Sequence, residues 1–184
     1  MINEGNTSSL ETLSFTDCTF DDYSRSIIRL KDNASISIDN LIIDNCVITN
    51  QGSDNYACFY WNNAAYSIAN FIMSNTTVNT ALHNVMDFRS SNTTNIEIEN
   101  CTFYNSMDAK KELPKVFRFD NAASTPPSPK SATMRNLIFS GPNKGKKMNS
   151  GNGAYDILNF SDNCYITSDL QEGLSLIHIS EPTR

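Results

Sequence analysis

Short runs in which apolar and polar residues alternate recur along this chain. The clearest run is residues 38–48, I-D-N-L-I-I-D-N-C-V-I, and similar runs occupy residues 68–78 and 93–103. Fainter copies occupy residues 10–20 and begin at Met134. Alternation with a period of two over a few residues predicts a short strand with one buried face. Because such strands return at intervals of a few tens of residues, the chain is expected to form a solenoid.

Asparagines flank each run. Aligning the copies on the first asparagine brings together positions 30, 25 and 41 residues apart, namely Asn40, Asn70, Asn95 and Asn136. In this alignment the fourth copy carries Leu137 and Phe139 inward. A second asparagine follows five residues later, at Asn45, Asn75 and Asn100, with Asp17 and Gly141 as variants. Asparagine tolerates the left-handed backbone of tight corners, and stacked amides hydrogen-bond to one another. We therefore expect asparagine ladders along the corners.

A second type of strand lies between these runs and is apolar at its first and third residues. The first positions are Ile28, Phe59, Met86, Phe117 and Leu158, and the third are Leu30, Trp61, Phe88, Phe119 and Phe160. A third short strand carries Ile48, Val78 and Phe103 inward. Three short strands per turn predict an all-β fold, a parallel β-helix with three sheets and about four to five coils.

The template N-[LIF]-x-[IFM]-x-N-[CT]-x-[FVI], the F-x-F-x strand and the closing D-N-C-Y-I-T-S-D of residues 162–169 carry a family resemblance. Over about residues 8–170 the chain resembles the right-handed parallel β-helix domains of the pectate-lyase-like superfamily. The resemblance implies a right-handed three-sheet β-helix from a secreted or cell-surface bacterial protein, with polysaccharide as the ligand class. Related lyases carry acidic calcium ligands and an Arg or Lys base on an outward strand, and this sequence has no matching motif.

The last eleven residues, L-S-L-I-H-I-S-E-P-T-R, look like an in-frame translation of a sequencing-library adapter. We therefore divide the chain into a truncated β-helix domain, residues 1–173, and a non-native tail, residues 174–184. A solenoid cut within a coil exposes unpaired strand edges, where complete repeats end in caps. The isolated chain is accordingly expected to self-associate through its coil ends.

The charge balance narrows the set of partners. Charged residues make up 18% of the chain, the net charge is −6, and the largest basic cluster is Lys144, Lys146 and Lys147. Nucleic acid and anionic membranes select for positive patches, so neither is an expected partner. No apolar run approaches the ~20 residues of a membrane-spanning helix. Residues 1–9 lack the pattern of a signal peptide, so the expected location outside the cell rests on the resemblance.

Cysteines occupy regular positions. The five are Cys18, Cys46, Cys58, Cys101 and Cys164, with no C-x-x-C among them. Three of them, Cys18, Cys46 and Cys101, share one repeat position, which is typical of a small inward residue. Side chains that point in parallel directions from stacked coils suit a disulfide poorly. We therefore expect free, buried thiols.

The outward positions of the second strand type are the candidate ligand-binding residues. Two neighbouring rows supply them, with Arg29, Tyr60, Asp87 and Arg118 in one and Arg89 and Asp120 in the other. Adjacent coils place Asp87 beside Arg118, and such a pair can bind a uronic acid or remove a sugar proton. Tyr60 can stack on a sugar ring. The other interpretation, which we favour, is a solvent-exposed charge ladder.

A catalytic interpretation would use Asp87, Arg118 and Asp120. Glycoside hydrolysis needs two carboxylates about 5 to 9.5 Å apart, and Asp87 and Asp120 lie one coil apart. Their arginine neighbours would keep both carboxylates ionised, so neither makes a good general acid. His83, the only histidine before residue 174, is interpreted as polar surface in a turn.

No cofactor is expected. The calcium alternative rests on two acidic pairs, Asp21 with Asp22 and Asp39 with Asp44. A calcium site needs six or more converging oxygens, and acidic pairs at solvated corners explain these residues equally well.

These observations predict a non-catalytic extracellular scaffold that binds carbohydrate or another partner. One alternative is a polysaccharide lyase or glycoside hydrolase whose site lies on the outward rows or in coils outside this chain. The other is an adhesin-type stalk without glycan affinity. An enzyme needs several aligned carboxylates or bases in a groove, whereas a scaffold shows a flat, self-paired ladder.

Overall fold

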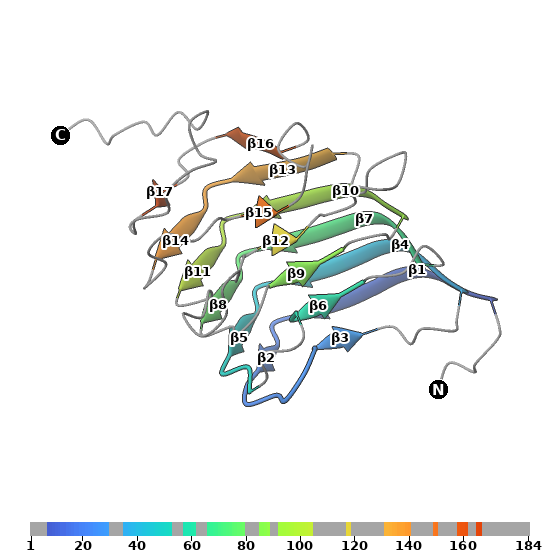
Figure 1. Ribbon diagram of the computed structural model, residues 1–184, viewed down its shortest axis with the longest axis horizontal. Helices are drawn as coiled ribbons and strands as arrows, with labels where there is room; N and C mark the ends of the chain where they lie inside the picture. Colours follow the sequence, from blue (N-terminus) through green and yellow to red (C-terminus); the bar gives the residue numbers. More distant parts are fainter. Residues whose placement is uncertain are drawn as a thin grey trace.

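Three parallel sheets wind around one core in the computed structural model (Figure 1). The structure describes residues 7–29, 35–52, 57–61, 66–79, 85–88, 92–104, 117–118, 131–140, 149–150, 158–161 and 165–166. Within them no helix has the length and apolar character needed to cross a bilayer.

Each coil contributes one strand to each sheet in turn. The long sheet contains β1 (Thr7–Thr16), β4 (Ser35–Asp44), β7 (Tyr66–Ser74), β10 (Asn92–Glu99), β13 (Ser131–Arg135) and β16 (Leu158–Ser161). The second sheet contains β2 (Thr19–Phe20), β5 (Val47–Thr49), β8 (Thr77–Asn79), β11 (Thr102–Tyr104), β14 (Ile138–Ser140) and β17 (Tyr165–Ile166). The third sheet contains β3 (Ile28–Arg29), β6 (Phe59–Tyr60), β9 (Met86–Asp87), β12 (Phe117–Arg118) and β15 (Asn149–Ser150).

Each strand from β1 to β14 pairs in parallel with the strand three places later in the sequence. This arrangement confirms the expected all-β, three-sheet parallel β-helix. The described strands make five coils with all three sheets, and a sixth coil adds β16 and β17. The five complete coils agree with the expected four to five.

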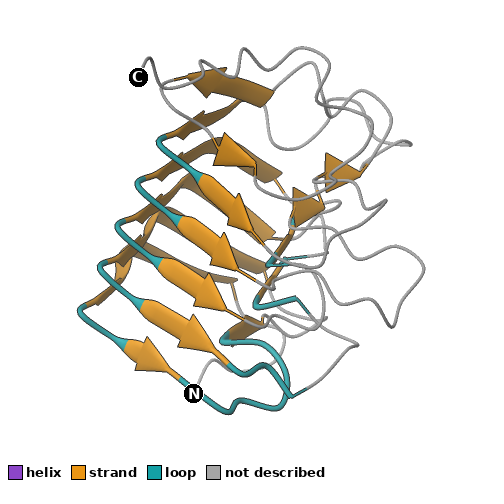
Figure 2. Ribbon diagram, turned by 90° about the vertical axis from the view of Figure 1, so that its left-hand side faces the viewer, coloured by secondary structure: helices purple, strands orange, loops and turns teal. Residues whose placement is uncertain are grey.

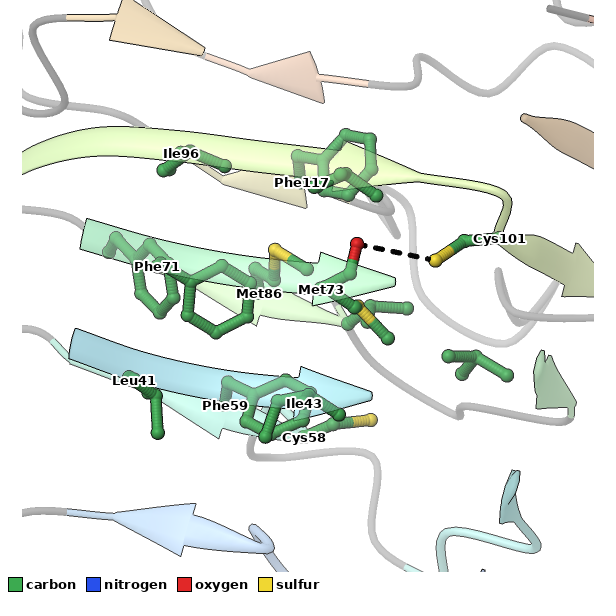
Figure 3. Packing of buried hydrophobic residues seen from close by; sticks show 14 of the residues in the cluster. Leu41, Ile43, Cys58, Phe59, Phe71, Met73, Met86, Ile96, Cys101 and Phe117 are labelled. Atoms are coloured by element: carbon green, nitrogen blue, oxygen red, sulfur yellow. Dashed lines mark hydrogen bonds between the residues drawn. The ribbon is translucent and has the colours of Figure 1, made fainter. Parts of the chain in front are cut away.

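Burial follows the predicted alternation of inward and outward residues. In β4, Ile36, Ile38, Leu41 and Ile43 are buried while the residues between them are not. Aromatic rings from different coils meet in the core (Figure 3). The ring centroids of Phe59 and Phe71 are 5.7 Å apart. Such edge-to-face pairs contribute roughly 0.5–1.5 kcal/mol each beyond the buried area. These ring contacts therefore stabilise the stacking of neighbouring coils.

The expected core position of Trp61 is confirmed. Its side chain is fully buried and meets Phe88 of the next coil edge to face at 5.7 Å. The third stacked positions Leu30 and Phe119 lie outside the described residues. Among those described, the second strand type thus packs inward as its apolar pattern predicts.

The alternation in β4, β7 and β10 is interrupted where two consecutive residues leave the core. Ile68 and Phe71 are both fully buried, and Ala69 and Asn70 between them are not. The same interruption occurs at Asp39 and Asn40, where the parallel pairing skips one residue. The inward side chains resume one residue late, so the strand changes direction at this point. Asparagine therefore stands at a bend inside the long strand as well as at its end.

The fourth repeat was aligned five residues too late. Ser131, not Asn136, pairs with Asn95 in the long sheet, and Asn136 occupies the corner position of Asn100. Ala132 and Met134 are the inward pair in place of Leu137 and Phe139, which belong to the following segment. A serine hydroxyl replaces the asparagine amide at this position, so the sequence pattern has no marker there.

Leu158 and Phe160 were also assigned to the wrong sheet. They pair with Ala132 and Met134 in the long sheet, whereas Asn149 continues the third sheet beside Phe117. Both strand types read apolar-x-apolar, so two residues of alternation cannot separate them. The expected self-association through coil ends stays a prediction, as does the adapter origin of residues 174–184, which lie outside the described residues.

Candidate functional site

The first polar feature is a ladder at the corner between the long and second sheets. Its members, which we call the corner ladder, all have a positive φ between 50° and 56° and are Asp17, Asn45, Asn75, Asn100 and Asn136. Few side chains other than Asn, Asp and Gly adopt this left-handed conformation without strain. Figure 2 shows the corners as similar turns stacked along one edge. The residue type is therefore set by the backbone.

Hydrogen bonds link the corner ladder from coil to coil. Asn45 Nδ2 donates to Asp17 Oδ1 at 2.5 Å, and Asn100 Nδ2 donates to Asn75 Oδ1 at 3.3 Å. Asn136 continues the chain by donating to Asn100 Oδ1 at 3.2 Å. These bonds confirm the predicted asparagine ladder and assign its side chains a structural task.

A second ladder runs along the bends within the long strands. We call it the bend ladder, and it comprises Asn40, Asn70, Asn95 and Ser131. Asn70 donates to Asn40 Oδ1 at 3.0 Å, and Asn95 donates to Asn70 Oδ1 at 3.0 Å. The Ser131 hydroxyl then donates to Asn95 Oδ1 at 2.9 Å. Each amide carries two N–H donors, so one N–H of Asn95 is not used within the ladder.

The predicted ligand-binding row on the third sheet has the expected backbone alignment. Arg29, Tyr60, Asp87 and Arg118 follow one another in the parallel pairing of β3, β6, β9 and β12. The guanidinium carbon of Arg29 lies 5.8 Å from the centre of the Tyr60 ring, within the range of a cation–π contact. Tyr60 is only half-exposed, which reduces the ring surface left for a sugar.

The burial of Asp87 contradicts the prediction of a solvent-exposed charge ladder on the third sheet. The sequence predicted a solvent-exposed side chain, and the structure gives it an exposed fraction of 0%. Met86 and Phe88 on either side belong to the hydrophobic core, so alternation still sends Asp87 away from the core. Asp87 also makes an interaction within the protein. The remaining candidates Arg89 and Asp120 lie outside the described residues, as does His83.

A hollow on the outer face of the long sheet is the best-defined site in the described part of the chain. It has a volume of about 230 Å³ and spans β7, β10 and β13 beside the bend ladder. Its lining residues are Asn70, Phe71, Ile72, Asn95, Ile96, Glu97, Ser131 and Thr133. The Phe71 and Ile96 side chains are buried in the core, so the hollow meets their backbone. Two amides, two hydroxyls, a carboxylate and an aliphatic side chain therefore line it.

Glu97 is the charged residue of the hollow. It is exposed, and its strand neighbours in the parallel pairing are Ile72 and Thr133. Two residues further along, Glu99 accepts a hydrogen bond from Arg135 at 2.8 Å and is half-exposed. The Glu99 charge is thus compensated, while Glu97 has no partner within the described part of the structure.

The acidic pairs considered for calcium do not converge. No group of three or more His, Cys, Asp or Glu side chains is arranged to hold a metal within the described ranges. Asp21 Oδ1 accepts hydrogen bonds from Thr49 and Asn50, and these donors lower the pKa of the Asp21 carboxyl. Hydrogen bonds from Ser74 and Asn75 likewise lower the pKa of Asp44. Both carboxylates act as acceptors that join neighbouring coils.

The described cysteines are free, as the repeat pattern predicted, and Cys164 lies outside the described residues. Cys46, Cys58 and Cys101 are free and buried, and Cys18 is free and half-buried. Burial raises the pKa of Cys58 and of Cys101 to about 12. Cys101 Sγ lies 3.6 Å from the Met73 carbonyl oxygen, the contact drawn in Figure 3. These thiols fill the core and are poor nucleophiles.

Sequence reasoning missed the hollow. None of its lining residues was among the candidate ligand-binding residues. The usable signal was the bend ladder, because a strand that turns at an asparagine leaves room on its outer face.

Comparison with known proteins adds no relative. No protein-family model matches the chain, and no curated protein or solved structure matches it. The resemblance to the pectate-lyase-like superfamily therefore stays a prediction, and the functional argument rests on the hollow.

Proposed function

We propose that this β-helix is a non-catalytic scaffold that binds carbohydrate on the outer face of its long sheet. The supporting observation is the hollow beside the bend ladder. A sugar ring carries hydroxyls around its edge and a C–H surface on each face. The hollow offers matching groups, with Asn95, Ser131 and Thr133 for hydroxyls and Ile72 for an apolar face.

The scale of the fold also supports a glycan. Parallel strands repeat at ~4.8 Å, so a surface spanning three neighbouring strands is about 10 Å long. That length accommodates one or two sugar residues of a chain that runs along the solenoid axis. Neighbouring coils would extend the contact with the same polar rows. We propose an extracellular or cell-surface setting for the same reason, since polysaccharides are accessible there.

Glycan-array screening of the 184-residue chain, followed by calorimetry on any hit, tests the proposal. Ile72→Ala removes part of the apolar floor and is expected to weaken binding roughly fivefold, equivalent to about 1 kcal/mol. The matched control is Ile42→Ala, because Ile42 pairs with Ile72 in the next strand but does not line the hollow. Equal loss in both variants, or no glycan hit at all, would overturn the proposed site.

The enzymatic alternative stays open to a direct assay. A lyase or hydrolase would release new reducing ends from the polysaccharide that binds, and a scaffold would not. The assay should use any glycan identified by the array, with and without calcium. Steady release of product that is lost in Asp87→Asn would move the function to the third sheet.

A further inference from the structure

We infer that the hollow selects glycans that carry protonated amino groups, with Glu97 as the residue that recognises the charge. The inference rests on the proposed carbohydrate function and adds the chemical class of the sugar. It follows from the charges around the hollow and from the hydrogen bonds that the bend ladder leaves available.

The Glu97 carboxylate is available for a ligand. Its side chain is exposed and has no hydrogen bond or ion pair within the described part of the chain. The residues next to it in the pairing, Ile72 and Thr133, are uncharged. A carboxylate in this position accepts hydrogen bonds only, so an ammonium group suits it better than a hydroxyl does.

The surrounding charges favour a cation over an anion. Arg135 is the basic side chain described on this face of the sheet, and its guanidinium already donates to Glu99 at 2.8 Å. Among the residues that the structure describes, no basic side chain compensates the negative charge of Glu97 in the hollow. The chain as a whole carries a net charge of −6, which raises the local concentration of cationic ligands. A uronic acid would meet repulsion here.

The bend ladder can hold the hydroxyls of the same sugar. Asn95 uses one amide hydrogen on Asn70, and its second hydrogen can be donated to a ligand. Ser131 gives its hydroxyl hydrogen to Asn95, so its oxygen can accept. A donor, an acceptor and a carboxylate on the two neighbouring strands β10 and β13 match an amino sugar more closely than a neutral sugar.

The test compares three soluble oligosaccharides of equal length by calorimetry in mildly acidic buffer. They are a glucosamine oligomer, its N-acetylated neutral counterpart and an oligogalacturonate. The glucosamine oligomer is expected to bind about fivefold more tightly than the neutral one, the size of an exposed ion pair. The oligogalacturonate is expected to bind most weakly. Raising the salt concentration should shrink these differences.

Glu97→Gln should remove the preference while retaining the binding of the neutral oligomer. The control is Glu11→Gln, which removes one exposed carboxylate from the same sheet in the first coil, outside the hollow. It should leave the preference intact. An equal loss in both variants would show that overall charge, and not Glu97, attracts the amine, and would overturn the inference.

The outcomes separate this inference from the proposed function. Equal affinity for the charged and neutral oligomers, with Glu97→Gln unchanged, sinks the amino-sugar inference and leaves glycan binding in place. Failure of all three oligomers to bind also overturns the amino-sugar inference, whereas the proposed function falls only if the glycan array gives no hit at all. Far-UV circular dichroism checks that each variant keeps its strands.

Discussion

The corner ladder and the hollow are both polar and both contain asparagine, but they differ in how many of their hydrogen-bonding groups the fold itself uses. In the corner ladder each asparagine amide donates to the preceding coil, from Asn45 onward to Asn136. At the hollow, Glu97 has no partner among the described residues, and Asn95 keeps one amide hydrogen.

The difference shows how a structural polar row can be told from a binding surface in a repeat protein. A residue whose donors and acceptors are already satisfied gains little from a ligand, and its loss is felt in stability. A residue with unused capacity on an exposed face costs the fold little when it is changed. The number of unused donors and acceptors is thus more informative than the residue type.

The largest expected difference is in the rate at which a thiol is alkylated in the hollow and beside the corner ladder. Thr133→Cys would place a thiol in the hollow, and it should react with iodoacetamide at least about a hundredfold faster than the buried Cys101. Burial raises the pKa of Cys101 to about 12, so its reactive thiolate is scarce at neutral pH. Peptide mapping after timed alkylation measures both rates. Comparable labelling of the two sites would show that the corner opens readily.

The next largest effect is on stability. Asn75 has a φ of 50°, and Asn75→Val forces a β-branched residue into that conformation while removing the ladder bonds. We expect a loss of about 2–3 kcal/mol in the free energy of unfolding, measured by urea titration.

Asn75→Gly is the control for this experiment. It keeps the backbone conformation accessible and removes only the side chain, so its loss should be about 1 kcal/mol. Equal losses for the valine and glycine variants would mean that backbone strain does not determine the residue type at the corner.

A smaller effect is expected on acidification. Hydrogen bonds from Ser74 and Asn75 lower the pKa of Asp44 in the folded chain below the ordinary value of 3.8. A lowered folded pKa contributes stability that is complete above the unfolded pKa and is lost as the pH falls through the folded pKa. Urea titrations at and below pH 4 should show a loss of a few tenths of a kcal/mol that Asp44→Asn abolishes. An unchanged pH profile in that variant would contradict this assignment.

The smallest effect is expected at the hollow. Glu97→Gln should change the free energy of unfolding by less than about 0.5 kcal/mol, because the carboxylate has no partner to lose in the described structure. A matched urea titration of the wild type and the variant measures this. A loss as large as that of Asn75→Gly would mean that Glu97 supports the fold and would weaken its role in binding.

The fold could be predicted from the sequence because the backbone conformation at each repeated position restricts which residue types can occupy it. Asn45, Asn75 and Asn100 mark three corners by their tolerance of positive φ, and the apolar alternation beside them defines the inward face. The fourth repeat was misaligned because Ser131 performs the task of an asparagine through its hydroxyl. Because a serine hydroxyl and an asparagine amide can make the same hydrogen bond, the repeat has no single residue type at this position.

The candidate site was harder to predict because it depends on shape. Alternation correctly sent Asp87 away from the core, but the burial of its outward side chain is not visible in a strand pattern. The hollow likewise lies beside Asn70 and Asn95, and its shape is not visible in a strand pattern. Sequence periodicity therefore gives the direction of a side chain and not its surroundings.

The constant backbone conformation of the corner ladder determines where the chain can accept insertions and deletions during evolution. Successive corner residues are separated by 28, 30, 25 and 36 positions, yet all share one backbone conformation. All of the length variation is absorbed elsewhere in each coil. Lineages can therefore lengthen, shorten or replace those other segments independently while the stack keeps its pitch. The corner keeps one backbone conformation, while the rest of each coil can vary in length and sequence.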